Sequence, residues 1–336
     1  MKRIIFVLFL LSVIMAEDTK YAGAFLELGI GPRALGMGNA YVALSEDGTG
    51  FYWNPGGMAF ITQIEASAMY ANLFNSLENH GYLNCAVPIF GGVVLSVSWI
   101  RLAVDDIPRM YDANLDRYTR AQRMSRDRSI WLTAPPVDYF SFTNNAYFFT
   151  FAKLIHWKAN LGWQYFELPI DIGYGINFKW VDLSLDDKHG SGVGIDGGIK
   201  IKFGLQDLFN SEYYGDLSFG MSSQDILETR LTWDTDTKHQ DRIARSWRYG
   251  LAYIQPLNFL SSDLVLAYDI YTKYEGSGHL GLEYIYRSMF ALRFGSNAGS
   301  FTAGAGISYW RLRLDYAYQG HDDLGNSHRV GLGFGF

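Results

Sequence analysis

The chain has 336 residues, of which 16% are aromatic, 36 are glycine and only 8 are proline. Many aromatic residues and few prolines favour pleated strands joined by tight turns. The formal net charge of −6 excludes the general basic field that attracts nucleic acid, so we expect no nucleic-acid partner.

The first residues have the order of a secretory signal. A basic start at residues 1–3 is followed by an apolar run at 4–15 and by the small residue Ala16. This run is shorter than the ~20 residues that a membrane-spanning helix needs. We therefore predict that residues 1–16 are a cleaved signal peptide that exports the chain. An uncleaved anchor is the alternative, because Ile14 departs from the small-residue pattern of a cleavage site.

Residues 17–60 lack a regular apolar period and are rich in glycine and polar residues. Glycine at this density permits left-handed backbone and close approach of one segment to another. The segment is therefore predicted to be a compact hatch inside a confined lumen. The spacing of Gly31 and Gly36 resembles a phosphate-binding loop, but no Lys followed by Ser or Thr comes after Gly36, and that interpretation is rejected.

Residues 61–336 alternate large apolar residues with small or polar ones, over segments of about ten residues, the length at which a tilted strand crosses a bilayer. Between 171 and 182 one face carries Ile172, Tyr174, Ile176, Phe178 and Trp180, whereas the other carries Asp171, Gly173, Gly175, Asn177 and Lys179. A soluble β-sandwich shows the same alternation, with its apolar face in a core. The alternation alone leaves both architectures open.

The pattern predicts an all-β fold, a transmembrane antiparallel β-barrel of about 14 strands plugged by the hatch. The expected strand cores are 62–72, 79–88, 91–102, 145–155, 170–182, 192–203, 214–222, 245–255, 262–272, 278–287, 289–296, 301–309, 311–319 and 327–336. Long polar gaps at 103–144, 183–191 and 223–244 follow odd-numbered strands, as a barrel with both ends in the periplasm requires. The joint at 156–169 is too long for this rule.

Two further features favour a membrane barrel over a sandwich. The last strand ends on an aromatic residue, and Phe334 and Phe336 are typical of the C-terminal signal that the barrel assembly machinery recognises. Tyr and Trp also gather at strand ends, where interfacial girdles lie: Trp180, Trp247, Tyr249, Tyr309 and Trp310. We therefore expect the bacterial outer membrane as the location, with its lipids and lipopolysaccharide as partners.

Charged residues on the polar strand faces are expected to line the lumen and to pair with one another: Asp171, Lys179, Arg311, Arg313, Asp315 and Arg329. In the hatch, Arg33 is expected to pair with Asp315 or Glu283 and so to anchor the plug.

The gap after the third strand contains an arginine-rich stretch with Arg120, Arg123, Arg126 and Arg128. A solvated, salt-bridged extracellular loop is one interpretation. A docking surface for a partner or for lipopolysaccharide phosphates is the other. The aromatic residues that follow in the same gap would suit a protein cargo or a hydrophobic ligand: Tyr139, Phe140 and Phe142.

No enzyme is predicted. Ser327 and His328 offer the residue types of a nucleophile and a base, but neighbours in a strand point to opposite faces and cannot meet. The other histidines, such as His156, His189 and His239, lack metal-ligand spacing. We expect neither a metal nor a cofactor.

The hatch sequence resembles the opening of the PorV/PorQ family of outer-membrane proteins. The residues that carry this resemblance are Ala24-Phe25-Leu26-x-Leu28-Gly29-x-Gly31-Pro32-Arg33-Ala34-Leu35-Gly36-Met37-Gly38-x-Ala40-Tyr41-Val42-Ala43 and Tyr52-Trp53-Asn54-Pro55-Gly56-Gly57-Met58. The far end is similar to the family's last hairpin, with Asp315-Tyr316-Ala317-Tyr318 and Asp323-Leu324-Gly325-Asn326-Ser327-His328-Arg329.

That family is itself similar to the FadL long-chain fatty-acid channels, which are fourteen-stranded barrels with an Asn-Pro-Ala element in their hatch. Asn54-Pro55-Gly56 stands in its place here. Resemblance to PorV implies an accessory role in type IX protein secretion, in which the barrel accepts cargo proteins from the translocon. Resemblance to FadL implies instead passive transport of fatty acids or other hydrophobic compounds through a site near the hatch. A structural envelope protein is the third alternative.

Overall fold

The computed structural model describes residues 22–73, 77–109, 138–160, 162, 167–273, 277–320 and 325–336. Its strands are β1 (Glu65–Leu73), β2 (Glu78–Ile89), β3 (Val93–Arg109), β4 (Asp138–Asn160), β5 (Glu167–Leu185), β6 (Lys188–Gly204), β7 (Asp216–Gln224), β8 (Arg230–Trp233), β9 (Gln240–Arg242), β10 (Ser246–Leu257), β11 (Ser262–Tyr271), β12 (Ser277–Tyr286), β13 (Phe290–Asn297), β14 (Ser300–Tyr309), β15 (Leu312–Gln319) and β16 (Ser327–Gly335). Its short helices are η1 (Ala24–Glu27), α1 (Pro32–Gly36), α2 (Gly50–Trp53), η2 (Pro55–Phe60), α5 (Leu205–Phe209) and η4 (Asn258–Leu260).

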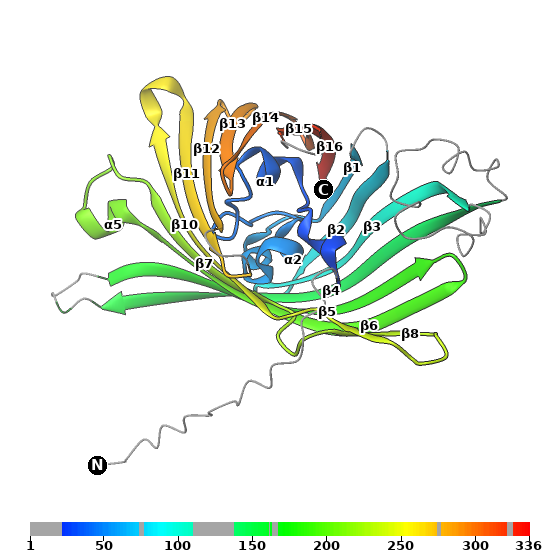
Figure 1. Ribbon diagram of the computed structural model, residues 1–336. Coiled ribbons are helices and arrows are strands. Elements are labelled where there is room, and N and C mark those ends of the chain that lie inside the picture. The colour runs from blue at the N-terminus through cyan, green and yellow to red at the C-terminus, as the bar shows by residue number, and fades with distance from the viewer. Residues whose placement is uncertain are drawn as a thin grey trace, which may run out of the picture.

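The strands form one antiparallel sheet that closes on itself (Figure 1). Around the ring the order is β5-β4-β3-β2-β1-β16-β15-β14-β13-β12-β11-β10-β7-β6, and pairing of β5 with β6 closes it. The short strands β8 and β9 form a hairpin attached to β6 at Gly190 and Ser191. Setting these two aside, 14 of the 16 strands in the described residues build the wall. The predicted fourteen-stranded transmembrane barrel is confirmed.

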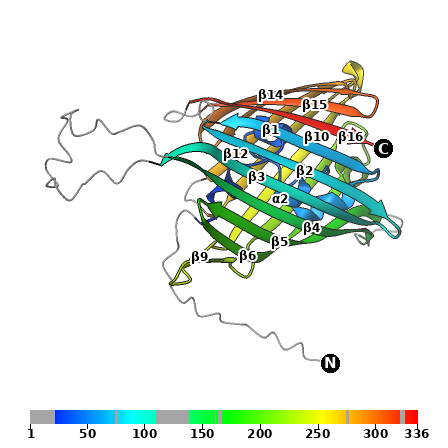
Figure 2. The same ribbon diagram turned by 90° about the vertical axis from the view of Figure 1, so that its right-hand side faces the viewer.

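The two rims of the barrel differ in which ends of the strands they carry (Figure 2). We call the rim where β1 begins and β16 ends the terminal rim, since Glu65 pairs there with Gly335. We call the opposite rim the loop rim. It carries the ends of β3 and β5 together with the β8–β9 hairpin.

The two faces of the wall differ as the alternation predicts. Phe178 and Trp180 of β5 are 56% and 51% exposed on the outside, whereas Asn177 and Lys179 between them are buried against the lumen. The apolar face therefore points outward and the polar face inward, which is the reverse of a soluble sandwich and the arrangement of a barrel in lipid.

Two expected connections are instead strand. β4 and β5 continue to Asn160 and from Glu167, through most of the joint expected at 156–169. Cross-strand pairs such as Lys158 Nζ with Glu167 Oε2, 3.2 Å apart, support this polar extension. The gap expected at 183–191 is a tight turn at Asp186, whose φ of 56° is left-handed. Both expectations were wrong because backbone pairing continues where the apolar alternation has stopped.

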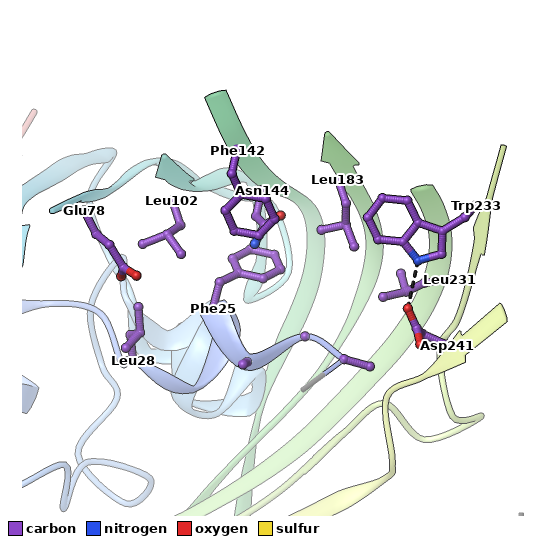
Figure 3. A pocket seen from close by; sticks show the side chains of 13 residues that line it. Phe25, Leu28, Glu78, Leu102, Phe142, Asn144, Leu183, Leu231, Trp233 and Asp241 are labelled. Carbon is purple, nitrogen blue, oxygen red and sulfur yellow. Dashed lines mark hydrogen bonds between the residues drawn. The ribbon is translucent and has the colours of Figure 1, made fainter. Parts of the chain in front are cut away.

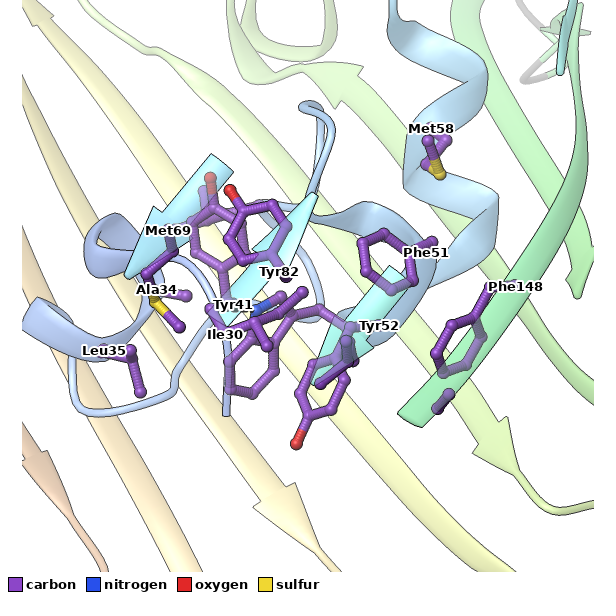
Figure 4. Packing of buried hydrophobic residues seen from close by; sticks show 14 of the residues in the cluster. Ile30, Ala34, Leu35, Tyr41, Phe51, Tyr52, Met58, Met69, Tyr82 and Phe148 are labelled. Carbon is purple, nitrogen blue, oxygen red and sulfur yellow. Dashed lines mark hydrogen bonds between the residues drawn. The ribbon is translucent and has the colours of Figure 1, made fainter. Parts of the chain in front are cut away.

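The described part of the hatch lies inside the barrel with η1, α1, α2 and η2 (Figure 1). Its apolar side chains pack against one another and against lumen-facing wall residues (Figure 4). Phe51, for example, has its ring centroid 5.0 Å from that of Phe148 on β4 and 6.3 Å from that of Tyr82 on β2. Within the described residues, no helix is long and apolar enough to cross a membrane.

Candidate ligand site at the loop rim

The hatch is fixed at its centre by Asn54, which caps η2. Its side-chain Oδ1 accepts from the Gly56 amide at 3.0 Å. Its Nδ2 donates to the carbonyl oxygens of Val42 and of Ile199 on β6, both at 3.0 Å. One side chain therefore joins two hatch segments to the wall. Trp53, the residue before it, donates from Nε1 to the Ile30 carbonyl at 3.0 Å.

Glycines of the hatch lie against the backbone of the wall. A Cβ on Gly56 would lie 2.7 Å from the Gly198 carbonyl oxygen and 2.8 Å from that of Gly173. Gly38 has a left-handed φ of 64°, and a Cβ there would lie 2.6 Å from the Leu280 carbonyl oxygen. Because glycine has no Cβ, the hatch backbone can approach the wall more closely at these two positions than any other residue would allow.

The remaining residues of the predicted hatch motif are buried in this contact zone. Gly36 lies against Gly304 on β14, and the fully buried Met37 against Gly281 on β12. Gly31 packs on Thr49 and Gly57 on Ser45, both within the hatch. Pro55 lies over Gly175 of β5.

Salt bridges join the hatch to β12–β15. Of the two partners expected for Arg33, Glu283 of β12 is the one that it contacts, with Nη2 2.7 Å from Oε2. The other carboxylate oxygen of Glu283 lies 2.6 Å from Arg293 Nε on β13. Arg293 then reaches Asp315 on β15, with Nη1 2.7 Å from Oδ1. All three wall side chains are at least nine-tenths buried, so each depends on its partners for compensation.

The chain of contacts returns to the hatch through Arg313. Its Nε lies 3.1 Å from Asp315 Oδ2 and its Nη2 3.5 Å from Asp47 Oδ2. The Tyr41 hydroxyl donates to Asp47 at 2.6 Å and accepts from Arg33 at 3.2 Å. Burial opposes ionisation of Asp47, but Arg313 and Arg33 outweigh it, so the pKa of this carboxyl lies below its ordinary value. We call this closed set of contacts the charged ring.

Other polar contacts hold the rest of the hatch. Glu46 pairs with Lys200 at 2.8 Å and with Lys202 at 3.3 Å, both on β6. Burial raises the pKa of Glu46, but the two lysines outweigh burial and leave that pKa lowered. Arg329 of β16 donates from Nη1 to the Leu28 carbonyl at 2.7 Å.

The other charged residues expected in the lumen differ in burial and in position along the barrel. Lys179 is buried between Asp196 and Asp225, with Nζ···O distances of 2.9 and 2.7 Å. Asp171 is half-exposed near the terminal rim, where its Oδ1 lies 2.6 Å from His156 Nδ1. The expectation for Arg311 was wrong.

Arg311 is exposed in the turn between β14 and β15, and its guanidinium lies over the Trp310 ring at 5.4 Å. Trp310 takes a left-handed φ of 57°, which reverses the chain before Arg311. That turn places Arg311 at the terminal rim rather than in the lumen.

A pocket of about 540 Å³ opens at the loop rim, above the start of the hatch (Figure 3). Its walls come from the hatch, from β2–β5 and from the β8–β9 hairpin. Most lining residues are apolar: Ala22, Gly23, Ala24, Phe25, Leu28, Leu102, Phe142, Leu183, Leu231 and Trp233. The volume falls within the range of about 300–1,000 Å³ that is usual for small-molecule sites.

Three polar residues complete this mouth pocket: Glu78, Asn144 and Asp241. Trp233 Nε1 donates to Asp241 Oδ2 at 2.8 Å and so fixes the indole (Figure 3). Asn144 is 6% exposed, and within the described chain its Oδ1 has no hydrogen-bond partner. Apolar walls with a few convergent polar groups are typical of a ligand site.

Among the aromatic residues expected after the third strand, Phe142 lines the mouth pocket. Phe140 lies 5.7 Å under the Arg109 guanidinium, and Tyr139 is 57% exposed at the loop rim. The four arginines expected to form a binding loop, Arg120, Arg123, Arg126 and Arg128, lie outside the described residues.

The sequence reasoning missed most of the pocket. Leu231 and Trp233 lie in the polar gap expected at 223–244, although Leu231-Thr232-Trp233 alternates like a strand. That short alternation is the one signal that pointed to the β8–β9 hairpin.

Ser327 is buried toward the lumen and His328 is exposed on the outside, the opposite placement that argued against a catalytic pair. His328 Nδ1 lies 2.6 Å from the Tyr316 hydroxyl on β15. In the described ranges, no group of three or more His, Cys, Asp or Glu residues could hold a metal ion. At the chain end, the Phe334 and Phe336 rings lie 4.6 Å apart.

The fold and the site together define a hatch-plugged outer-membrane β-barrel. Neither a protein-family profile nor a curated protein matches the sequence. The solved toluene transporter TbuX of Ralstonia pickettii is similar in fold, with a TM-score of 0.50, 10% identity, and 91% of this chain and 97% of that chain covered. The toluene transporter TodX of P. putida has a TM-score of 0.47 at 10% identity, with 92% and 99% covered.

Proposed function

We propose that this protein is an outer-membrane channel for hydrophobic small molecules and that the mouth pocket is their first binding site. The observation that carries the proposal is an apolar pocket of about 540 Å³ directly above a buried hatch. The fold that the chain shares with a toluene transporter supports the same function. This alternative from the sequence is now favoured over protein secretion.

The path beyond the pocket is proposed to leave the barrel sideways. Hatch residues such as Met37 and Met58 are fully buried, so the hatch fills the lumen beneath the pocket. A second, mostly apolar pocket of about 310 Å³ lies at Gly81 of β2. Its lining includes the buried Tyr82 and the exposed Tyr70. This pocket is therefore lined by residues of the lumen face and of the outer face of the wall. They meet at Gly81, which has no side chain to separate them.

The chain is proposed to lie in the outer membrane, with its apolar outer face in contact with lipid. Residues 1–16 would direct export to the periplasm and would then be removed, and the assembly machinery would recognise Phe334 and Phe336. The loop rim would then face outward, since it carries the longer connections. Outer-membrane lipids and lipopolysaccharide would cover the exposed apolar band, which includes Phe149, Phe178 and Leu332.

Uptake by intact cells tests the proposal. Cells that produce the chain should accumulate a labelled alkylbenzene at low external concentration several times faster than matched cells that lack it. Equal rates, with the folded barrel present in the outer membrane, would contradict the channel function.

Accessory protein secretion is the second candidate, because the hatch motif resembles that of PorV and Tyr139 is exposed at the loop rim. Gentle detergent extraction followed by mass spectrometry distinguishes the two. Stoichiometric translocon subunits or secreted cargo would favour secretion. A bound apolar compound without protein partners would favour transport. Absence of both, with unchanged uptake, would leave a structural envelope role.

A further inference from the structure

The charge of the mouth pocket bears on which hydrophobic compounds enter it. Glu78 and Asp241 contribute carboxylates, and within the described residues no Lys, Arg or His lines the pocket. A ligand carboxylate would therefore lose its hydration in an apolar space without gaining a cation, and it would meet charges of its own sign.

We propose that the mouth pocket selects uncharged aromatic compounds that carry a hydroxyl group and rejects carboxylates of the same size. This inference rests on the proposed transport function and names its substrate class. It departs from a fatty-acid channel, in which the carboxylate is part of the substrate.

The apolar part of the pocket suits a flat ring. Phe25 from η1, Phe142 from β4 and Trp233 from β8 converge on the space from three separate elements (Figure 3). Aromatic pairs favour offset or edge-to-face contacts with a ring ligand. The bond from Trp233 to Asp241 holds the indole in one orientation, so this wall is formed before a ligand arrives.

Asn144 supplies the polar contact for the hydroxyl group. Its Oδ1 is buried without a hydrogen-bond partner in the described chain, and the residue lines the pocket. This oxygen has almost no accessible surface in the ligand-free barrel, so the amide of Asn144 turns toward the pocket as the ligand binds. The ligand O–H then removes the desolvation cost of the unpaired oxygen. A phenol satisfies this acceptor, whereas an alkylbenzene leaves it unpaired and a carboxylate offers no donor.

Glu78 makes the pocket repel anions. It stands at the start of β2, on the side of the pocket away from Trp233 (Figure 3). Among the described residues, its carboxylate has no salt-bridge partner within 4.0 Å, in contrast to the paired carboxylates of the charged ring. Its charge therefore acts on the pocket without a neighbouring cation to offset it.

Binding to the full-length mature barrel in lipid nanodiscs tests this selectivity at pH 8. The probes are 4-propylphenol, propylbenzene and 4-propylbenzoate, which share one ring and chain and differ in a single substituent. We expect the phenol to bind about fivefold more tightly than propylbenzene, the size of one neutral hydrogen bond. We expect the benzoate to bind at least about tenfold more weakly than the phenol.

Two variants assign these differences to residues. Asn144→Leu should remove the preference for the phenol over propylbenzene and leave the exclusion of the benzoate. Glu78→Gln should narrow the gap between phenol and benzoate, whereas the exposed Glu167→Gln at the terminal rim should leave it unchanged. The faster gel migration of an unheated, folded barrel verifies each variant.

Equal binding of all three probes, or tighter binding of the benzoate, would overturn the selectivity and leave the transport proposal standing. Selectivity that survives both variants would overturn the assigned residues. If no probe binds and cells show no chain-dependent uptake, both proposals are overturned together.

Discussion

The hatch meets the barrel wall in two contrasting ways. Toward β12–β15 it presents Arg33 and Asp47, which take part in the charged ring of paired and mostly buried side chains. Toward β3–β5 and β8 it presents Phe25 and Leu28, which border an apolar pocket instead of filling it. The difference indicates a division of labour, in which the charged ring fixes the plug and the opposite side leaves space for a ligand.

Glu283→Gln tests the charged half of this comparison and should have the largest effect on stability. The change leaves Arg33 and Arg293 without the carboxylate that compensates both. Breaking a buried pair in this way costs about 3–5 kcal/mol. Thermal unfolding in detergent and protease sensitivity of the hatch would measure the loss.

The matched control is Glu167→Gln, which removes an exposed partner of Lys158. Exposed pairs contribute about 0–1 kcal/mol, so this variant should behave like the wild type. If the two variants lost equal stability, the charged ring would not be what holds the hatch.

Gly38→Ala tests how closely the hatch approaches the wall. Its new Cβ would lie 2.6 Å from the Leu280 carbonyl oxygen in a residue with positive φ, which should cost about 2–3 kcal/mol. Gly91 also has a positive φ, but nothing lies within 4 Å of its Cβ position. Gly91→Ala should therefore cost about 1 kcal/mol from backbone strain alone. Denaturant titration of both variants measures their free energies of unfolding, and the difference isolates the contact between Gly38 and the wall. Equal losses of stability would argue against that contact.

Acid should weaken the attachment of the hatch through Glu46, with a smaller loss of stability than the Glu283 and Gly38 variants cause. Lys200 and Lys202 leave its pKa lowered despite burial. A lowered pKa in the folded state stabilises the fold above the unfolded pKa of about 4.3. This contribution is lost as the pH falls through the folded value. Melting curves between pH 7 and pH 3 should show a shallower acid decline for Glu46→Gln, and an unchanged slope would exclude this pair as a source.

The barrel itself could be predicted because the two-residue period of a strand appears in the sequence as an alternation of apolar and polar residues. Phe178 and Trp180 point outward and Lys179 inward, as their alternation requires. The pattern failed where polar residues occupy both faces, as at Lys158 and Glu167, because hydrogen bonds between strands do not depend on the side chains.

The candidate site could be predicted only in part. Phe142 and Glu283, the wall partner of Arg33, were among the expected residues, since both follow from local residue types. The mouth pocket joins Phe25, Leu102 and Trp233, which are far apart in the sequence. Their meeting depends on the closure of the ring and on the β8–β9 hairpin, and neither property is local.

Filling the mouth pocket is the most direct test of the central claim that ligands enter there. Leu183→Trp would place an indole in the pocket, whereas Leu227→Trp makes the same change at a position that is 73% exposed and outside the lining. With equal amounts of folded barrel, we predict that Leu183→Trp lowers cellular uptake of labelled 4-propylphenol at least about tenfold and that Leu227→Trp leaves it unchanged. Wild-type uptake by the Leu183→Trp barrel would show that compounds do not pass through this pocket.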